Sequence, residues 1–136
     1  MLKDSMSFFS FSTDSIDAAQ QFYADTLGLD VERWGDEGMG EMLWLTMPGD
    51  AGHALIYTKD DHQPATHTVL NFSVDDFDGE VAALRAKGIT FEVLEWTDET
   101  GIARDVEGRM PATAWFKDPG GNWLLVGEKM TEGPVS

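Results

Sequence analysis

The chain contains no cysteine, so a disulfide framework and a thiolate metal site are both excluded. No apolar run approaches the roughly 20 residues that a membrane-spanning helix needs. The first residues, Met1-Leu-Lys-Asp4, also lack the basic and apolar regions of a targeting signal. We therefore expect a cytoplasmic protein that has no membrane partner.

Positive charge is scarce. Lys and Arg number 9 against 25 Asp and Glu, which gives the 136 residues a formal net charge of −16. Such a chain repels phosphate, so we expect no nucleic-acid partner. The acidity is compatible with a cationic ligand, and it also keeps a protein in solution without any role in binding. Hydrophobic residues make up 42% of the chain, which is enough for a folded core.

The chain does contain an internal repeat. Residues Phe11–Asp17 (FSTDSID) are echoed by Phe72–Asp78 (FSVDDFD), and Trp44–Gly49 (WLTMPG) is echoed by Trp115–Gly120 (WFKDPG). Two echoes in the same order indicate two copies of a unit of roughly sixty residues. We expect a ligand to bind between the two copies. The predicted organisation is a single domain of residues 1–136, with a first module at about 6–59, a linker at 60–66, a second module at about 67–129 and a loose tail at 130–136.

Each module is predicted to contain a strand, a helix and three further strands, from the period of its apolar residues. In the first module the predicted strands are Met6–Thr13, Leu29–Trp34, Met42–Met47 and Ala54–Thr58, with a helix that Asp14 or Ser15 caps and that runs to about Leu27. In the second they are His67–Val74, Ile89–Glu95, Ala112–Lys117 and Asn122–Val126, with a helix that Asp75 or Asp76 caps and Gly88 ends. A polar loop is predicted between Trp96 and Pro111, and loops of this length are often functional.

The first strand of each module has one apolar face, which should pack on the helix, and one mixed face. Neutral polar groups on an apolar lining are usual in small-molecule pockets. Trp44 and Trp115 occupy equivalent repeat positions, where we expect a shared core role. Trp34 and Trp96 end equivalent strands and are expected at the rim, where aromatic walls suit flat or cationic ligands.

Three motifs resemble the vicinal oxygen chelate superfamily, which includes glyoxalase I, bleomycin resistance proteins and extradiol dioxygenases. They are Phe22-Tyr-Ala-Asp-Thr-Leu-Gly-Leu29, Val74-Asp-Asp76 and Phe116-Lys-Asp-Pro-Gly-Gly-Asn122. The resemblance extends from about Met6 to Glu128. It implies an α+β fold in which two tandem βαβββ modules form a half-open mixed β-barrel around a cleft. By analogy with the family, it also implies a homodimer.

In the metal-using members of this family, four cleft-facing positions carry His, Gln or Glu. The resemblance places these positions at Phe8, Ile56, Val69 and Leu125, to within one residue for Ile56. None of these side chains can bind a divalent metal ion. We therefore expect no metal and no cofactor.

Three readings are compatible with these observations. The first is a metal-free binding protein of the bleomycin-resistance type, which sequesters a small aromatic compound, cationic or not, in an acidic, Trp-lined cleft. The side chains expected to contact this ligand are Phe8, Ser10, Ser12, Ile56, His67, Val69, Asn71, Trp123 and Leu125.

The second function is catalysis, by a glyoxalase-like or dioxygenase-like enzyme with a lyase, isomerase, oxidoreductase or hydrolase activity. In a metal-independent enzyme the catalytic residue is His67, a strand-end side chain on the mixed face, or a carboxylate. The other version is a metal enzyme whose ligands lie at positions other than the four given above. His53 and His62 are expected at the surface, and the sequence reveals no nucleophile–base pair. A third reading is a structural or partner-binding module, in which Phe8, Val69, Trp123 and Leu125 fill the cleft.

Overall fold

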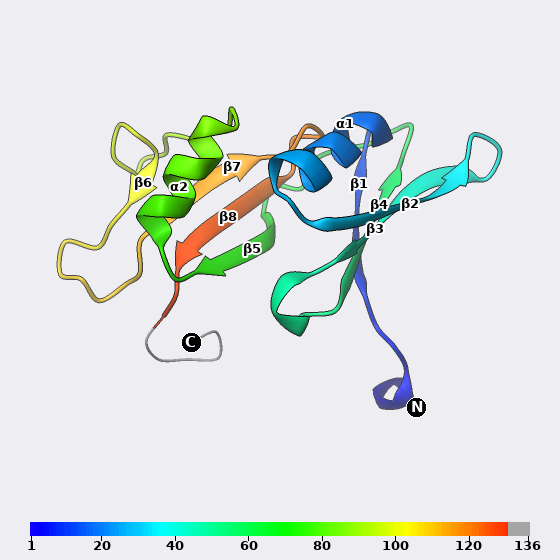
Figure 1. The fold of residues 1–136 in the computed structure, drawn as a ribbon, viewed down its shortest axis with the longest axis horizontal. Helices are drawn as coiled ribbons and strands as arrows, with labels where there is room; N and C mark the ends of the chain where they lie inside the picture. Colours follow the sequence, from blue (N-terminus) through cyan, green and yellow to red (C-terminus); the bar gives the residue numbers. More distant parts are fainter. Residues whose placement is uncertain (131–136) are drawn as a thin grey trace. The chain divides into compact units, whose positions relative to one another are not determined.

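The computed structural model describes residues 1–130, which form two compact units divided between Pro64 and Ala65 (Figure 1). Unit 1 starts at Met1 and unit 2 starts at Ala65. The tail predicted at 130–136 lies, from residue 131 onward, outside the described residues. Within residues 1–130, no helix has both the length and the apolar character required to cross a membrane.

Unit 1 contains a four-stranded sheet and one helical segment. Its elements are β1 (Phe9–Thr13), α1 (Ile16–Gln20), the π-type turns η2 (Gln21–Thr26), β2 (Asp30–Asp36), β3 (Gly40–Thr46) and β4 (His53–Thr58), with short 3-10 turns η1 (Leu2–Asp4) and η3 (Pro48–Asp50). The strand order is β1-β4-β3-β2, with β1 parallel to β4 and the other pairs antiparallel. The helix begins where predicted, because the Ser15 hydroxyl accepts a hydrogen bond from the Ala18 N–H at 3.3 Å.

Unit 2 repeats this arrangement. Its elements are β5 (Thr68–Val74), α2 (Phe77–Ala86), β6 (Ile102–Ala103), β7 (Thr113–Lys117) and β8 (Trp123–Glu128). The strand order is β5-β8-β7-β6, and β5 is parallel to β8. The carboxylate of Asp76 caps α2 by accepting the Gly79 N–H at 3.1 Å. The predicted α+β class, with two tandem βαβββ modules, is confirmed.

One face of each sheet is covered by the helix of its own unit. In unit 1, α1 packs against β3, and the ring of Phe11 in β1 lies 6.2 Å from that of Tyr23. In unit 2, α2 packs against β8 (Figure 1). The nearly or fully buried side chains of these faces include Phe11, Leu43, Leu45 and Ile56 in unit 1, and Leu70, Ala114, Phe116, Leu124 and Val126 in unit 2. The opposite face of each sheet is therefore the one that remains open within its unit.

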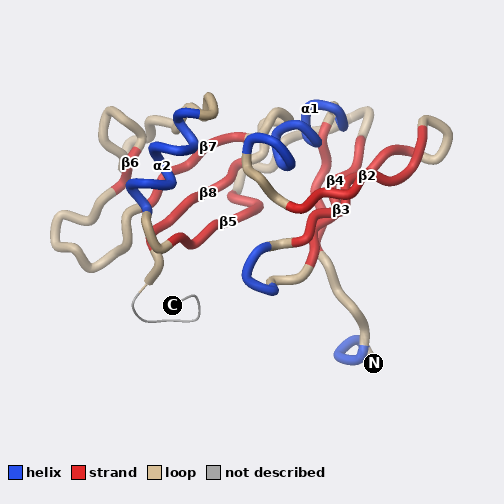
Figure 2. The backbone as a smooth tube through the Cα atoms, in the orientation of Figure 1, coloured by secondary structure: helices blue, strands red, loops and turns tan. Residues whose placement is uncertain are grey.

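The segment predicted as a strand at Ile89–Glu95 is not one. Residues 87–101 form a long connection without regular strands (Figure 2), in which the Glu92 N–H still donates to the Trp115 carbonyl at 2.8 Å. On the side of β7 away from β8, the strand that pairs with it is the short β6, inside the predicted polar loop. The Asp98 carboxylate explains this, because it accepts the N–H groups of Thr100 and Ile102 and fixes a tight turn that delivers Ile102 to Ala114.

Candidate functional site

The face of the unit 1 sheet that points away from α1 carries a continuous row of aromatic and polar side chains. Strand register defines this face. In one row across the sheet, Ser10 of β1 lies opposite Leu55 of β4, and Leu55 lies opposite Trp44 of β3. The next row consists of Ser12, Tyr57 and Met42. Glu32 and Trp34 extend it along β2, opposite Trp44 and Met42. We call this surface the open face of unit 1. Its members are Phe8, Ser10, Ser12, Glu32, Trp34, Met42, Trp44, Leu55 and Tyr57.

A hollow of about 370 Å³ lies on this open face. We call it the aromatic hollow, and its lining consists of Phe8, Glu32, Trp34, Met42, Trp44 and Leu55. Phe8 meets Trp44 edge to face, with ring centroids 5.1 Å apart. Trp34 is 55% exposed and Phe8 is 50% exposed, so both rings offer free area to a ligand within this unit. Five of the six side chains are apolar and the sixth is a carboxylate, a chemistry that suits a flat molecule with or without positive charge.

His53 lies beside the hollow on the same face of the sheet, because it is two residues from Leu55 along β4. Its imidazole stacks on the indole of Trp44, with centroids 4.7 Å apart and an interplanar angle of 22°. Within residues 1–130 the buried Nδ1 of His53 has no hydrogen-bond partner. His53 is therefore half-buried: its Nδ1 is enclosed, while the residue as a whole keeps part of the surface exposure that the sequence predicts.

A serine–histidine pair lies on the same open face. Ser12 Oγ and His62 Nδ1 are 2.7 Å apart, and the pair is partly buried. A turn brings His62 into place, since its N–H donates to the Lys59 carbonyl while the Lys59 N–H donates to the Thr13 carbonyl, both at 3.1 Å. This pair has no signature in the sequence, because its members lie 50 positions apart, one in a strand and one in the polar linker.

The open face of unit 2 carries three tryptophans. Trp115 Nε1 donates to Thr68 Oγ1 at 3.2 Å, and its ring meets Trp96 edge to face at 5.8 Å. The ammonium of Lys117 sits 4.6 Å from the Trp123 ring centroid. Trp44 and Trp115 are thus equivalent, as predicted. However, both lie on open faces and are only partly buried, so the expected core role is wrong.

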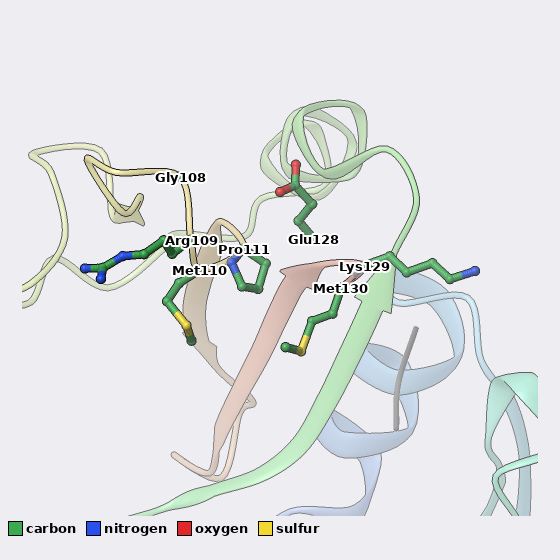
Figure 3. A pocket seen from close by; sticks show the side chains of 7 residues that line it. All are labelled: Gly108, Arg109, Met110, Pro111, Glu128, Lys129 and Met130. Atoms are coloured by element: carbon green, nitrogen blue, oxygen red, sulfur yellow. The ribbon is translucent and has the colours of Figure 1, made fainter. Parts of the chain in front are cut away.

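Unit 2 also has a hollow of about 270 Å³ beyond the end of β8. Figure 3 shows its lining, with Arg109 and Lys129 extending away from each other and Glu128 pointing towards α2. Arg109 pairs with Glu107 at 2.8 Å, and Lys129 lies 3.8 Å from Asp75. Since both cations already have carboxylate partners, this hollow offers little net charge to a ligand.

The predicted ligand-contacting residues fall into three groups. Phe8, Ser10 and Ser12 lie on the open face of unit 1, and Asn71, Trp123 and Leu125 lie on that of unit 2. Val69 is the extra residue of a bulge in β5, where the register steps from Thr68 to Leu70, and the exposed His67 precedes the strand.

Ile56 is the exception, and its predicted position facing a ligand is wrong. It is 0% exposed and lies opposite Phe11 and Leu43 on the helix-covered face. The neighbouring Leu55 takes the open-face position, because a shift of one residue moves a strand side chain to the other face of the sheet. The sequence gap between the two repeats concealed this shift.

The donors needed for a metal are missing from the positions where the family resemblance places them. Phe8, Val69 and Leu125 are apolar, and replacing Ile56 by Leu55 leaves the fourth position apolar as well. Among residues 1–130, no three His, Asp or Glu side chains gather closely enough to hold a metal ion. The described residues therefore do not fit the metal of the family's enzymes.

The sequence of residues 5–126 matches the Glyoxalase/Bleomycin resistance protein/Dioxygenase superfamily. The chain belongs to this superfamily. No functionally curated protein matches it in sequence. The superfamily assignment agrees with the repeat, the two βαβββ units and the three motifs of the sequence.

Solved structures with the same fold belong to proteins with different described functions. TnmS3, an antibiotic binding protein from Streptomyces sp. CB03234, is 21% identical with a TM-score of 0.65, covering 94% of this chain and 98% of its own. Lactoylglutathione lyase from Agrobacterium tumefaciens is 22% identical with a TM-score of 0.63, over 92% and 93%. The fosfomycin resistance protein FosX from Listeria monocytogenes is 11% identical with a TM-score of 0.69, over 94% and 95%. Likeness at this level of identity establishes the fold, while function depends on the site itself.

Proposed function

We propose that this superfamily member binds a small aromatic compound, neutral or cationic, and sequesters it without a metal. The observation that carries this proposal is the aromatic hollow, in which Trp34, Trp44 and Phe8 surround a space beside a single carboxylate, Glu32. Its volume of about 370 Å³ lies within the usual range of small-molecule pockets, roughly 300 to 1,000 Å³.

Three physical terms support an aromatic ligand. Flat rings gain area and quadrupole contacts against indole and phenyl side chains. A cation gains attraction to the indole faces and to Glu32, in a chain whose net charge is −16. The hydroxyl groups of Ser10 and Ser12, on the same open face, offer neutral hydrogen bonds to a polar substituent.

The remaining parts of the proposal concern the setting of this site. We propose that the five residues of unit 2 predicted to contact a ligand, His67, Val69, Asn71, Trp123 and Leu125, form a ligand-contacting surface of their own unit. We further propose that the protein acts as a homodimer in the cytoplasm. Sedimentation equilibrium at micromolar concentration tests the dimer, and a single monomeric species would contradict it.

Intrinsic tryptophan fluorescence tests the binding proposal. The protein is titrated with a cationic acridine, a neutral acridine and an anionic acridine carboxylate. We expect saturable quenching by the first two and weaker binding of the third, because Glu32 repels a carboxylate. Trp34→Ala should weaken binding strongly, since this residue lines the hollow and is 55% exposed. Trp96→Phe, which changes an exposed ring in unit 2, reports the contribution of the other unit.

The outcomes separate the explanations. Saturable binding that Trp34→Ala leaves unchanged would place the ligand elsewhere and contradict the proposal for the hollow. An alternative function is a glyoxalase-like or dioxygenase-like enzyme, for which His67 was the candidate residue. Stoichiometric metal in the purified protein, absent after chelation, would favour that alternative. Unchanged turnover in His67→Ala would show that His67 is not the catalytic residue of such an enzyme.

A further inference from the structure

The Ser12–His62 pair has the geometry of an activated hydroxyl. The 2.7 Å separation between Ser12 Oγ and His62 Nδ1 is that of a short, well-formed hydrogen bond. In the His62 tautomer that carries its proton on Nε2, Nδ1 accepts and the serine hydroxyl donates to it. A hydroxyl within hydrogen-bond reach of such a base is the arrangement that converts serine into a nucleophile.

The surroundings of the pair supply a place for a substrate. Ser12 lies opposite Tyr57 in β4, and Tyr57 lies opposite Met42, which lines the aromatic hollow. Adjacent strands are about 4.8 Å apart, so Ser12 lies roughly 10 Å across the sheet from Met42. On the same face, Leu55 of the hollow lies opposite Ser10, only two residues before Ser12. A ring held against Leu55 can thus carry a substituent that reaches Ser12.

We propose that Ser12 and His62 form an acyl-transfer site for esters of aromatic alcohols, with the aryl group held in the aromatic hollow. His62 Nδ1 takes the hydroxyl proton while Ser12 Oγ forms a bond to the ester carbonyl carbon. The bond from that carbon to the aryloxide breaks, and His62 returns the proton to the leaving aryloxide. A water molecule then attacks the acyl-serine with His62 as base, which releases the carboxylic acid and restores the hydroxyl.

The repeat provides an internal comparison for this site. Ser73 of β5 occupies the position that corresponds to Ser12 in the two FS-containing echoes, and it is exposed. In residues 1–130 Ser73 forms no hydrogen bond to an imidazole. The two serines therefore share strand position and residue type, and they differ in the base. A reaction that depends on His62 should occur at Ser12 and not at Ser73.

The experiment uses p-nitrophenyl acetate with the full-length protein. Release of p-nitrophenolate is followed by absorbance, and acid-quenched samples are digested and examined by mass spectrometry. We expect an acetyl group on the peptide that contains Ser12. His62→Gln should slow acylation by about 100-fold or more, the usual contribution of a general base. Ser12→Ala should abolish the Ser12 adduct, whereas Ser73→Ala should react like the unmodified chain.

Two further measurements separate catalysis from folding. Added imidazole should restore acylation of Ser12 in His62→Gly, a rescue that a structural role of His62 does not predict. Thermal unfolding of each variant identifies any that fails to fold, and Ser12→Cys keeps a nucleophile if Ser12→Ala does not fold. An acetyl group found only on lysine, tyrosine or other serines would overturn the inference, as would a Ser12 adduct formed equally fast in His62→Gln.

This inference rests on the proposed function, because that function supplies the site that binds the aryl group. The binding proposal and the acyl-transfer proposal can fail separately. Trp34→Ala should raise the KM for the ester with little change in kcat if the ring occupies the hollow. Saturable acridine binding without acylation of Ser12 would leave the binding proposal intact and overturn this one. If Trp34→Ala does not affect acylation of Ser12, Ser12 is still a nucleophile, but the aryl group does not bind in the aromatic hollow.

Discussion

The imidazole of His53 stacks on the indole of Trp44, and its buried Nδ1 lacks a hydrogen-bond partner within residues 1–130. The two features have opposite effects on stability. Ring stacking is favourable, whereas a buried polar atom without a partner is costly to remove from water. A substitution at His53 can therefore improve the stability of this contact, which lies beside the aromatic hollow.

His53→Phe should raise the free energy of unfolding by about 1 kcal/mol, because it keeps the stacked ring and removes the unsatisfied nitrogen. His53→Ala should lower it by about 1 kcal/mol, since it loses the stacking itself. Urea unfolding followed by circular dichroism measures both changes. A His53→Phe variant less stable than the unmodified chain would indicate that a water molecule satisfies Nδ1.

The cap of α2 gives a second prediction. The Asp76 carboxylate accepts the Gly79 N–H at 3.1 Å, so Asp76→Ala should cost about 1 kcal/mol of stability. Asp76→Ser should recover most of that loss, because a serine hydroxyl also accepts at this position. Equal stability of the Ala and Ser variants in urea unfolding would contradict a capping role.

The effect of Gly79→Ala on the free energy of unfolding should depend on whether the Asp76 cap is present. Glycine inside a helix usually costs about 1 kcal/mol relative to alanine, yet a Cβ at Gly79 would collide with the Asp76 carboxylate. Gly79→Ala should therefore gain little in the unmodified chain and about 1 kcal/mol in the Asp76→Ala background. A double-mutant cycle measures this coupling, and additive effects would argue that the carboxylate moves aside freely.

Acid stability should depend on Asp98. Its pKa is lowered by hydrogen bonds from the Thr100 hydroxyl and, secondly, from the Ile102 N–H. A lowered carboxyl pKa in the folded state contributes stability above the unfolded pKa of about 3.9, and this contribution is lost as the pH falls through the lower folded value.

Asp98→Asn should therefore be less stable than the unmodified chain at neutral pH, and the difference should shrink as the pH falls below about 4. Urea midpoints between neutral pH and pH 2 give the comparison. Glu99→Gln changes the adjacent exposed residue and should leave the pH profile close to that of the unmodified chain. A difference between Asp98→Asn and the unmodified chain that is constant with pH would point to a cause other than ionisation.

Glu32 should distinguish ligands by charge. It lies opposite Trp44 at an exposed edge of the aromatic hollow. Glu32→Gln should weaken binding of a cationic acridine by about 2- to 5-fold, the scale of an exposed ion pair, and leave the neutral acridine unaffected. Glu37→Gln, in the β2–β3 turn outside the hollow, serves as the charge-matched control. Equal loss for both acridines would mean that Glu32 contributes shape instead of charge.

Much of this fold is predictable from local patterns. Ser15 and Asp76 mark the helix starts because capping requires those side chains, and the echo of Phe11–Asp17 in Phe72–Asp78 predicts the duplicated βαβββ order. The strand at Ile89–Glu95 is not formed, because the turn fixed by Asp98 places Ile102 beside Ala114 instead. Residue patterns cannot reveal this turn, which depends on three hydrogen bonds to one carboxylate.

The candidate site is less predictable than the fold. To place Ile56, the two repeats have to be aligned across a gap in their sequences. An alignment error of one residue moves a strand side chain from the buried face of the sheet to the open face. Tryptophan is a large hydrophobic residue, so Trp44 and Trp115 are expected in the core. Only the strand register shows that they lie on open faces. The Ser12–His62 contact depends on a linker turn that has no periodic signal. Each of these properties arises from tertiary structure.

The position of β1 at the edge of its sheet has a consequence for synthesis of the protein. Its neighbour in that sheet is β4, which begins at His53, so about forty residues separate the end of one strand from the start of the other. A nascent chain emerges from the ribosome with β1 first. This strand cannot form its native pairing until β4, the last strand of its own module, has been translated. Unit 2 has the same order, with β5 waiting for β8. Each module is therefore completed only when its C-terminal strand has been translated, and an incomplete module leaves its first strand free to pair incorrectly.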